Sequence, residues 1–329
     1  MPYAAAAGLL ADVLPIASGA NANTLRDHTL RVAERAEAKL GEERSCFIDG
    51  CPAEWAALPI LEGRIVVGLD GGYVRDWKDR KANFEVIVGQ SIPEERDARY
   101  VGLVHIYDEK PKRRLFELLR SQGLQANQDV TFLTDGGEEV RALTELVTPE
   151  SGHVLDWFHI TMRLMVLCQY ARGVAHHDHA AGERLLADLE RIKWFLWHGN
   201  QYRAGQIIES FVSNVDDLEV DYPTLGRFAR ASHEFSVYIA SSVGSLINYG
   251  ERYRAGERIS SCLAESTVNA VISKRFAKRQ QMQWTKRGAH LLLQTRTRTL
   301  EGTLRSLFEE WYPSLANDNL AEAAQAAAA

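Results

Sequence analysis

Two aspartates follow apolar, β-branched runs and precede pairs of glycines, a pattern that can serve metal-dependent chemistry. Asp70 ends the run Arg64–Asp70, and Asp135 follows the run Asp129–Thr134. A carboxylate at the end of a buried strand is costly unless it is paired or binds a cation. Glycine lets a ligand or ion approach closely. We therefore expect neighbouring strands of one sheet to bring Asp70 and Asp135 together; the alternative for either aspartate alone is a turn or capping residue.

A third carboxylate, Glu265, lies in a segment whose apolar residues recur with helical spacing. On a helix, Glu265 shares a largely apolar face with Val268 and Ile272, whereas Lys274 and Lys278 point the opposite way. We expect the apolar face to pack on the sheet, which would bring the Glu265 carboxylate to the two aspartates.

The same segment is strongly basic. From Leu263 to Leu300 there are eight Lys or Arg and one acid, in a chain whose net charge is −6. This asymmetry is typical of a phosphate-binding surface, whereas a merely solvated face, the alternative, usually mixes signs. The residues expected to bind DNA are Lys274, Arg275, Lys278, Arg279, Lys286 and Arg287.

Three carboxylates beside a basic helix suit phosphoryl transfer assisted by two Mg²⁺ ions. Mg²⁺ prefers carboxylate oxygens, and without a cation the clustered negative charges would repel one another. We therefore expect Asp70, Asp135 and Glu265 to be the catalytic residues and the metal ligands, with Mg²⁺ as cofactor and Mn²⁺ as a substitute for it.

Length and composition exclude several other classes of protein. The 329 residues are 46% hydrophobic and 25% charged, as in an ordinary folded protein of about two domains. No apolar run approaches the roughly 18 residues of a membrane span. The stretch Ala4–Leu14 has no preceding Lys or Arg and contains Asp12, which favours a helix over a signal peptide. Four scattered cysteines fit a reducing cytoplasm.

The order of predicted elements is β-β-β-α-β-α-β, which indicates an α/β protein with a mixed five-stranded sheet and helices on both faces. The predicted strands are Arg64–Asp70, Asn83–Gln90, Arg99–Tyr107, Asp129–Thr134 and His153–Leu155, and the predicted helices between them are Pro111–Leu119 and Glu138–Leu146.

Helices are predicted on both sides of this region. Before it, Thr24 is a plausible N-cap of a helix that Gly41 ends. After Phe158 the chain reads as helical for about a hundred residues, with Asp178 capping one helix. Another helix is predicted from about Thr224 to Asn248, followed by a Gly- and Arg-rich loop over Tyr249–Arg258.

Three weaker patterns leave alternatives open. The segment around Pro15–Asn23 could be the turn of a helix-turn-helix rather than a link between packing helices. Cys46 and Cys51 lack a second pair at zinc-ligand spacing. His176, His177 and His179 could suggest a metal site, although the Asp178 among them has a capping role.

Several motifs together carry a resemblance to a known family. They are Gly68–Gly72 (GLDGG), Leu133–Gly137 (LTDGG), Leu155–His159 (LDWFH), Glu265–Asn269 (ESTVN), Gln281–Trp284 (QMQW) and Arg287–His290 (RGAH). In this order and at this spacing, from about Pro2 to Leu300, the chain resembles a DDE-type transposase of the bacterial insertion-sequence group called ISKra-four.

This resemblance implies an RNase H-like core in which the first strand carries Asp70, the fourth strand leads to Asp135, and a helix after a helical insertion carries Glu265. The implied organisation is an N-terminal helical segment (1–62), a core (63–160 and 263–305), a helical insertion (161–262) and a tail (306–329). The implied activity is metal-dependent DNA strand cleavage and strand transfer. Its partners would be double-stranded DNA, as transposon ends and target, and further copies of the chain on DNA, in the bacterial cytoplasm at the nucleoid without membrane association.

Two further motifs have both a functional and a local interpretation. Asp156 and His159 resemble the Asp/Cys-x-x-His motif of related transposases, which would support the active site. The alternative is that Asp156 caps a helix and His159 packs in its first turn. Trp284, Gly288 and Ala289 resemble the family's Trp-x-x-x-Gly-Ala motif, and the small residues would also let a helix pack closely.

The chain departs from the family in one respect. Members usually carry a longer region before the segment that resembles Pro2–Glu43, so we expect an N-terminally truncated DNA-binding region. Two other functions stay open: an RNase H-like nuclease or junction resolvase, and a non-catalytic DNA-binding remnant or regulator derived from a transposase.

Overall fold

The structure is a computed structural model that describes residues 3–14, 21–59, 63–79, 81–93, 96–145, 147–148, 151–261 and 284–315. The described residues leave out five of the predicted site residues, Glu265, Lys274, Arg275, Lys278 and Arg279, together with the motif Glu265–Asn269 and most of Gln281–Trp284. Their roles stay predictions.

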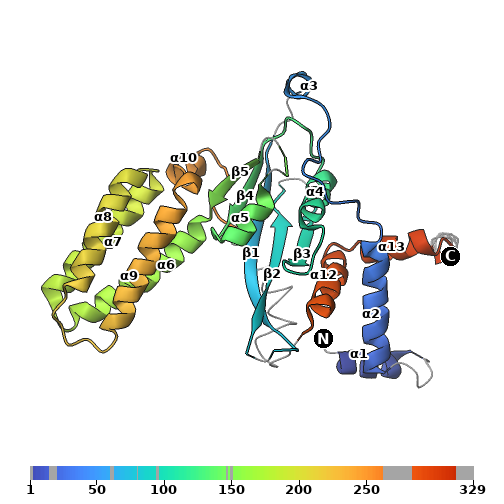
Figure 1. Cartoon of the computed structure of the whole chain (residues 1–329), viewed down its shortest axis with the longest axis horizontal. Coiled ribbons are helices and arrows are strands. Elements are labelled where there is room, and N and C mark those ends of the chain that lie inside the picture. The colour runs from blue at the N-terminus through green and yellow to red at the C-terminus, as the bar shows by residue number, and fades with distance from the viewer. Residues whose placement is uncertain are drawn as a thin grey trace, which may run out of the picture.

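The centre of the molecule is a five-stranded mixed sheet in the order β3-β2-β1-β4-β5 (Figure 1). The strands are β1 (Ile65–Arg75), β2 (Asn83–Ser91), β3 (Tyr100–Val104), β4 (Val130–Thr134) and β5 (Ser151–Leu155). β2 is antiparallel to both β1 and β3, whereas β4 is parallel to both β1 and β5. The α/β class and the mixed five-stranded sheet predicted from the sequence are therefore confirmed.

Two strands end at positions that differ from the prediction. β1 does not stop at Asp70 but continues through Gly71 to Arg75, because β2 pairs with it along that whole length. β3 ends at Val104 rather than Tyr107, where the chain turns. Asp70 consequently lies inside a strand and not at its end.

One face of the sheet is covered by α4 (Pro111–Ser121) and α5 (Glu138–Thr144). Side chains alternate between the faces of a strand, so Val67 and Leu69 of β1 share this side with Phe132 of β4. Leu115 and Leu119 of α4 are fully buried against them. This layer holds β1, which contains Asp70, and β4, which precedes Asp135, in one apolar core.

The opposite face is covered by two helices that lie far apart in the sequence. α12 (Lys286–Leu300) packs Ala289 and Leu293 on β2 and β3, and α6 (Trp157–Ala175) packs on the β4–β5 half. The residue just before α12 also extends the sheet, because Trp284 N–H donates to Arg75 O and Trp77 N–H donates to Trp284 O, both at 3.0 Å. The C-terminal part of the chain thus returns to the end of β1.

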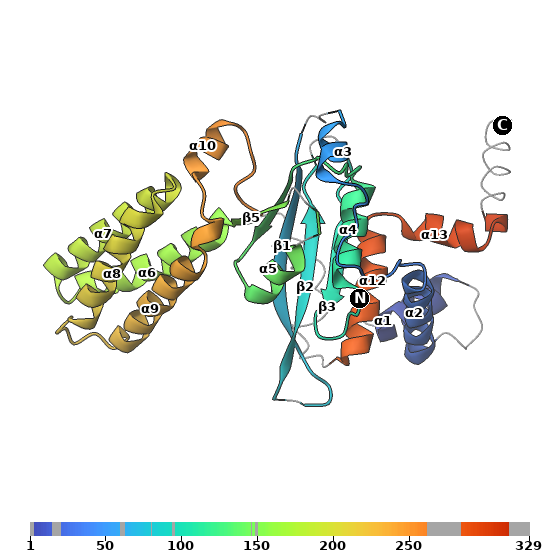
Figure 2. The same cartoon turned by 45° about the horizontal axis from the view of Figure 1, so that its top comes forward.

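A bundle of helices extends from the β5 side of the sheet (Figure 2). It contains α6, α7 (His179–Trp197), α8 (Gln201–Asp216) and α9 (Leu225–Ser241), followed by the 3-10 turn Val243–Ser245 and α10 (Tyr249–Arg254). The long helical stretch after Phe158 and the Asp178 cap are as predicted. The helix predicted to reach Asn248 ends at Ser241, and α10 lies in the predicted loop, where Asn248 caps it by accepting from Glu251 N–H.

The described N-terminal part adds α1 (Tyr3–Val13), α2 (Ala22–Glu37) and the short α3 (Pro52–Ala56). α2 begins earlier than predicted, because Asn21 rather than Thr24 caps it. Leu30 and Ala33 of α2 pack against Leu291 of α12, and α13 (Leu304–Trp311) follows α12. Among the described helices, none combines the length and apolarity that crossing a membrane requires.

Candidate active site

Asp70 and Asp135 occupy corresponding positions on neighbouring parallel strands. The last paired residues of β1 and β4 are Gly68 and Leu133, and each aspartate comes two residues later along its own strand direction. Parallel strands run side by side at a spacing of about 4.8 Å. The sheet therefore places Asp70 and Asp135 at corresponding positions on neighbouring strands, and the convergence of their carboxylates stays a prediction.

Asp70 is largely buried, with 8% of its surface exposed. Because of the strand's alternation, it shares a face of β1 with Val66 and Val74. Val66 belongs to the core formed with α6, and Val74 to the core formed with α12. Asp70 thus lies between the two helices that cover this face, where a carboxylate adds a charge to an otherwise apolar strand.

The sequence predicts that Gly71 gives a ligand access to Asp70, but in the structure this glycine has a different role. A Cβ atom on Gly71 would lie 2.7 Å from Oε1 of Glu85, so the Glu85 carboxylate fills the space beside this glycine. Burial raises the pKa of Glu85; the charge of His105 acts in the opposite direction, and the charges of Asp135 and Glu139 add to the increase. Glu85 and Glu139 therefore belong to the charged surroundings of Asp135.

Asp135 sits in a turn that its own carboxylate stabilises. Oδ1 of Asp135 accepts a hydrogen bond from Gly137 N–H at 2.9 Å. Gly136 adopts a φ of 84°, which favours glycine, and a Cβ atom there would lie 2.7 Å from Leu155 Cδ1. Both glycines after Asp135 thus serve the turn, and Gly136 also allows close packing on β5.

Two half-buried side chains, His153 and Tyr238, lie near Asp135 on the β5 side. His153 lies between the hydroxyls of Thr134 and Ser245, 2.5 Å from each. Burial and the charge of Arg141 lower the pKa of His153 to about 4, although Asp135 acts against this decrease. Burial raises the pKa of Tyr238, an effect that Arg163 opposes and that the charges of Asp135 and Asp156 strengthen.

Asp156 performs the local role that the sequence left open as an alternative. It is fully buried and caps α6, with Oδ1 accepting from Phe158 N–H at 2.8 Å. Oδ2 accepts from both the N–H and the hydroxyl of Ser261, at 2.9 Å for the N–H. His159 is half-buried in the first turn of α6, with its ring against Phe158. Asp156 therefore ties the start of α6 to the end of the insertion.

The described members of the predicted DNA-binding set have carboxylate partners within the chain. Lys286 lies 3.5 Å from Asp76, and Arg287 forms an ion pair with Glu34 of α2. Thr285 caps α12 by accepting from Gly288 N–H at 3.1 Å, and Ala289 is fully buried. Ala289 thus packs on the sheet, whereas a Cβ atom on Gly288 would meet only Oγ1 of Thr285, at 2.9 Å.

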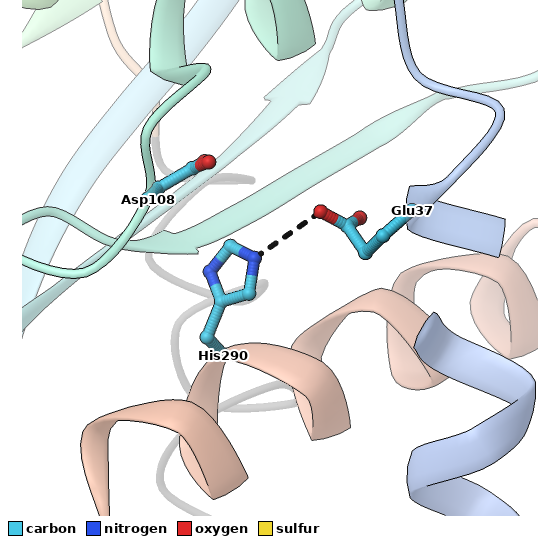
Figure 3. Close-up of side chains that lie close together, drawn as sticks. All are labelled: Glu37, Asp108 and His290. Atoms are coloured by element: carbon cyan, nitrogen blue, oxygen red, sulfur yellow. Dashed lines mark hydrogen bonds and ion pairs between the residues drawn. The ribbon is translucent and has the colours of Figure 1, made fainter. Parts of the chain in front are cut away.

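A second cluster of ionisable groups lies between α2, α12 and the turn after β3, and the sequence did not indicate it. The ligand-type atoms of Glu37, Asp108 and His290 all lie within 4.8 Å of one another (Figure 3). His290 is 3% exposed; its Nδ1 accepts from Val104 N–H and its Nε2 faces Glu37 Oε2, each at 3.4 Å. By donor type, this cluster could hold a metal.

The positive charge in this cluster comes from the guanidinium of Arg114, which takes the place that a metal ion would need. Its guanidinium donates to Glu37 Oε1 and Oε2 at 2.7 and 2.6 Å, and to Asp108 Oδ2 at 2.8 Å. Burial alone would raise the pKa of Glu37, but hydrogen bonds from His290 and Arg114 hold it at about 2. A metal ion would have to displace the guanidinium from both carboxylates. We therefore interpret the cluster as an ion-pair network that joins α2, α4 and α12.

The residues missed by sequence analysis had only faint signals. Arg114 interrupts the apolar face of its helix one turn before Leu118, and His290 precedes a run of three leucines. A charged residue within an apolar stripe indicates a buried partner, but the partners come from other segments of the chain. Glu85 lies in the predicted strand Asn83–Gln90 and was not singled out from the sequence.

Comparisons of the chain with protein-family models, with curated proteins and with solved structures found no match.

Proposed function

We propose that the protein is a DDE-type transposase with an RNase H-like core, which cleaves DNA strands and joins the released 3′-hydroxyl to target DNA. The observation that carries the proposal is the placement of Asp70 and Asp135 at corresponding positions on the parallel strands β1 and β4. The sheet is compatible with an RNase H-like core, and in the sequence the helices α6–α10 come between β5 and Glu265.

The donor set fits the proposed metal ions. Asp70 and Asp135 offer carboxylate oxygens, which Mg²⁺ prefers, and Glu265 is the proposed third ligand. Burial raises the pKa of the half-buried Glu85, His105 opposes this increase, and the charges of Asp135 and Glu139 add to it, so Asp135 is near at least one other carboxylate, whose charge a divalent cation would offset. When bound, two Mg²⁺ ions would activate an oxygen nucleophile and stabilise the leaving oxygen of the phosphodiester.

The chain's own residues would position these carboxylates. The turn at Gly136 and Gly137 fixes Asp135, and the hydrogen bonds of Asp156 to Ser261 hold the chain four residues before Glu265. Asp156 and His159 would then support the site by positioning, and Lys274, Arg275, Lys278 and Arg279 would bind the DNA backbone. The proposed partners are double-stranded DNA and further copies of the chain, at the bacterial nucleoid.

The test is strand cleavage of a supercoiled plasmid that carries the DNA flanking the protein's own gene, with Mg²⁺ or with a chelator. Removing a residue that merely orients a metal ligand costs about 10- to 100-fold, so Asp70→Asn and Asp135→Asn should each reduce cleavage by more than about 100-fold. DNA affinity should be retained, because a negative charge near phosphate is lost.

The matched control is Asp129→Asn. Asp129 precedes β4 at the other end of the same strand and forms an exposed ion pair with Arg64. This variant should cleave at the wild-type rate. Cleavage by Asp70→Asn or Asp135→Asn at a rate near that of Asp129→Asn would contradict the metal-holding role, and cleavage that persists in chelator would contradict the metal dependence.

A further inference from the structure

A basic cleft lies on the other side of the molecule's core from the helical bundle, where the ends of α2, α4 and α12 meet the start of β3. Its volume is about 420 Å³, within the range of pockets that hold small ligands, about 300–1,000 Å³. Six cationic side chains and three carboxylates line it, although the chain as a whole is acidic. The cleft therefore concentrates positive charge.

Most of these cations already have a carboxylate partner. Arg114 binds Glu37 and Asp108, Arg113 pairs with Glu117, and Lys39 pairs with Glu310. Among the described residues, no carboxylate lies within 4.0 Å of the guanidinium of Arg99 or Arg298. These two arginines can therefore accept an anion without first breaking an ion pair.

One hydrogen bond joins the segment that carries Arg99 to the segment that carries Arg298. The N–H of Tyr100, the residue after Arg99, donates to Glu301 Oε1 at 2.8 Å. Arg298 lies three residues before Glu301, so the two share one face of the helical turn. Both arginines are half-buried. Both residues line the cleft.

A purely structural role explains only part of this arrangement. Arg120 and Arg298 belong to the last turns of α4 and α12, where a cation complements the partial negative charge of the helix end. Arg99 belongs to no helix, so the partial charge of a helix end does not account for its place in the lining. The structure leaves a positive charge that an anionic ligand can neutralise.

We propose that this cleft, with Arg99 and Arg298 as its principal ligands, binds a phosphate group. The planar guanidinium donates paired hydrogen bonds that match phosphate oxygens. Arg120 also lines the cleft, but it is already paired with Glu117. The phosphate comes either from a free anion or from the backbone of duplex DNA. The site is separate from the candidate carboxylates, and it does not require that the protein cleave DNA.

The first measurement is binding of inorganic phosphate to the full chain by titration calorimetry. The wild type should bind it saturably, and Arg99→Gln and Arg298→Gln should each weaken binding about tenfold, the effect of losing one charge-assisted hydrogen bond. Arg99→Lys should weaken phosphate binding less than Arg99→Gln does, because lysine keeps the positive charge and loses only the paired hydrogen bonds of the guanidinium. The control is Arg203→Gln on α8, an exposed arginine outside the cleft, which should bind as the wild type does.

The second measurement is binding of a 20-base-pair duplex over a salt series, which identifies the source of the phosphate. If the cleft holds DNA, each Gln variant should reduce the slope of log affinity against log salt by about 0.9. An unchanged slope together with weakened phosphate binding would identify a free anion as the ligand. Asp70→Asn should bind phosphate like the wild type, so failure of the cleavage proposal leaves this one intact.

Two results would overturn the proposal. One is a wild type that binds neither inorganic phosphate saturably nor the duplex with a slope that the Gln variants change. The other is a set of Gln variants whose thermal unfolding midpoint falls while both binding measurements stay at wild-type values, which would leave the arginines with a role at the helix ends only.

Discussion

The guanidinium of Arg114 donates hydrogen bonds to both carboxylate oxygens of Glu37, at 2.7 and 2.6 Å, and so joins α4 to α2. The same guanidinium binds Asp108, whose side chain is 4% exposed, and Gln294 of α12. One cation thereby satisfies acceptors from three separate parts of the chain. Such a network is costly to break, because the partners left behind are buried charges.

Replacing Arg114 with methionine should destabilise the protein by about 3–5 kcal/mol, since Glu37 and Asp108 would remain buried without a cation. The measurement is the free energy of unfolding in urea. Arg191→Met is the control, because Arg191 is 62% exposed in its pair with Asp188 and should cost less than about 1 kcal/mol. Equal losses in the two variants would show that the Arg114 network does not stabilise the fold.

The network also predicts how stability depends on acid. The pKa of Glu37 is about 2 in the folded protein, against the ordinary value of 4.5 that applies to the unfolded chain. Its stabilising effect is complete above pH 4.5, and it is lost as the pH falls towards 2, because the unfolded chain takes up the proton first. Glu37→Gln should therefore make the free energy of unfolding less dependent on pH between 4.5 and 2.

The control for this pH series is Glu190→Gln, which changes an exposed carboxylate on α7. Its unfolding free energy should follow the wild type at every pH. If Glu37→Gln also followed the wild type through this range, the proposed effect of Arg114 and His290 on Glu37 would be wrong.

Gly89 in β2 should tolerate no side chain. A Cβ atom there would meet Leu69 Cδ2, and it would lie 2.9 Å from the backbone oxygen of Gly68 and 3.0 Å from Val101 Cγ1. Overpacking of this kind costs about 1–3 kcal/mol, which we expect for Gly89→Ala in urea unfolding. Gly205→Ala is the matched change within α8, where nothing lies within 4 Å of the new Cβ, and it should stabilise by about 0.5–1 kcal/mol.

Much of the fold could be predicted from local patterns. The buried run Arg64–Asp70 indicated β1, and Asp178 indicated the start of α7, because an apolar strand and an N-cap each leave a signal within a few residues. Because of the motif Asp70-Gly71-Gly72, the sequence prediction ended β1 too early. Glycine pairs usually mark turns, but here pairing with β2 keeps the chain extended.

The candidate site was predictable in part for the same reason. The similar surroundings of Asp70 and Asp135 indicated neighbouring strands, and the register agrees with that expectation. The ion-pair network could not be found in this way, since Glu37, Arg114 and His290 are separated by 77 and 176 residues. No local pattern relates partners at such distances, and only the packing of α2, α4 and α12 brings them together.

The packing of α12 on β2 and β3 has a consequence for how the protein is made. Val104 leaves the ribosome long before Leu293, which covers the same face of the sheet. At about 5–20 residues per second, roughly 10 to 40 s of synthesis separate the two. During that interval the helical bundle can fold on its own core, while the apolar face of β2 and β3 stays exposed. A nascent chain stalled before α12 should therefore be bound by chaperones and be sensitive to proteases at the sheet.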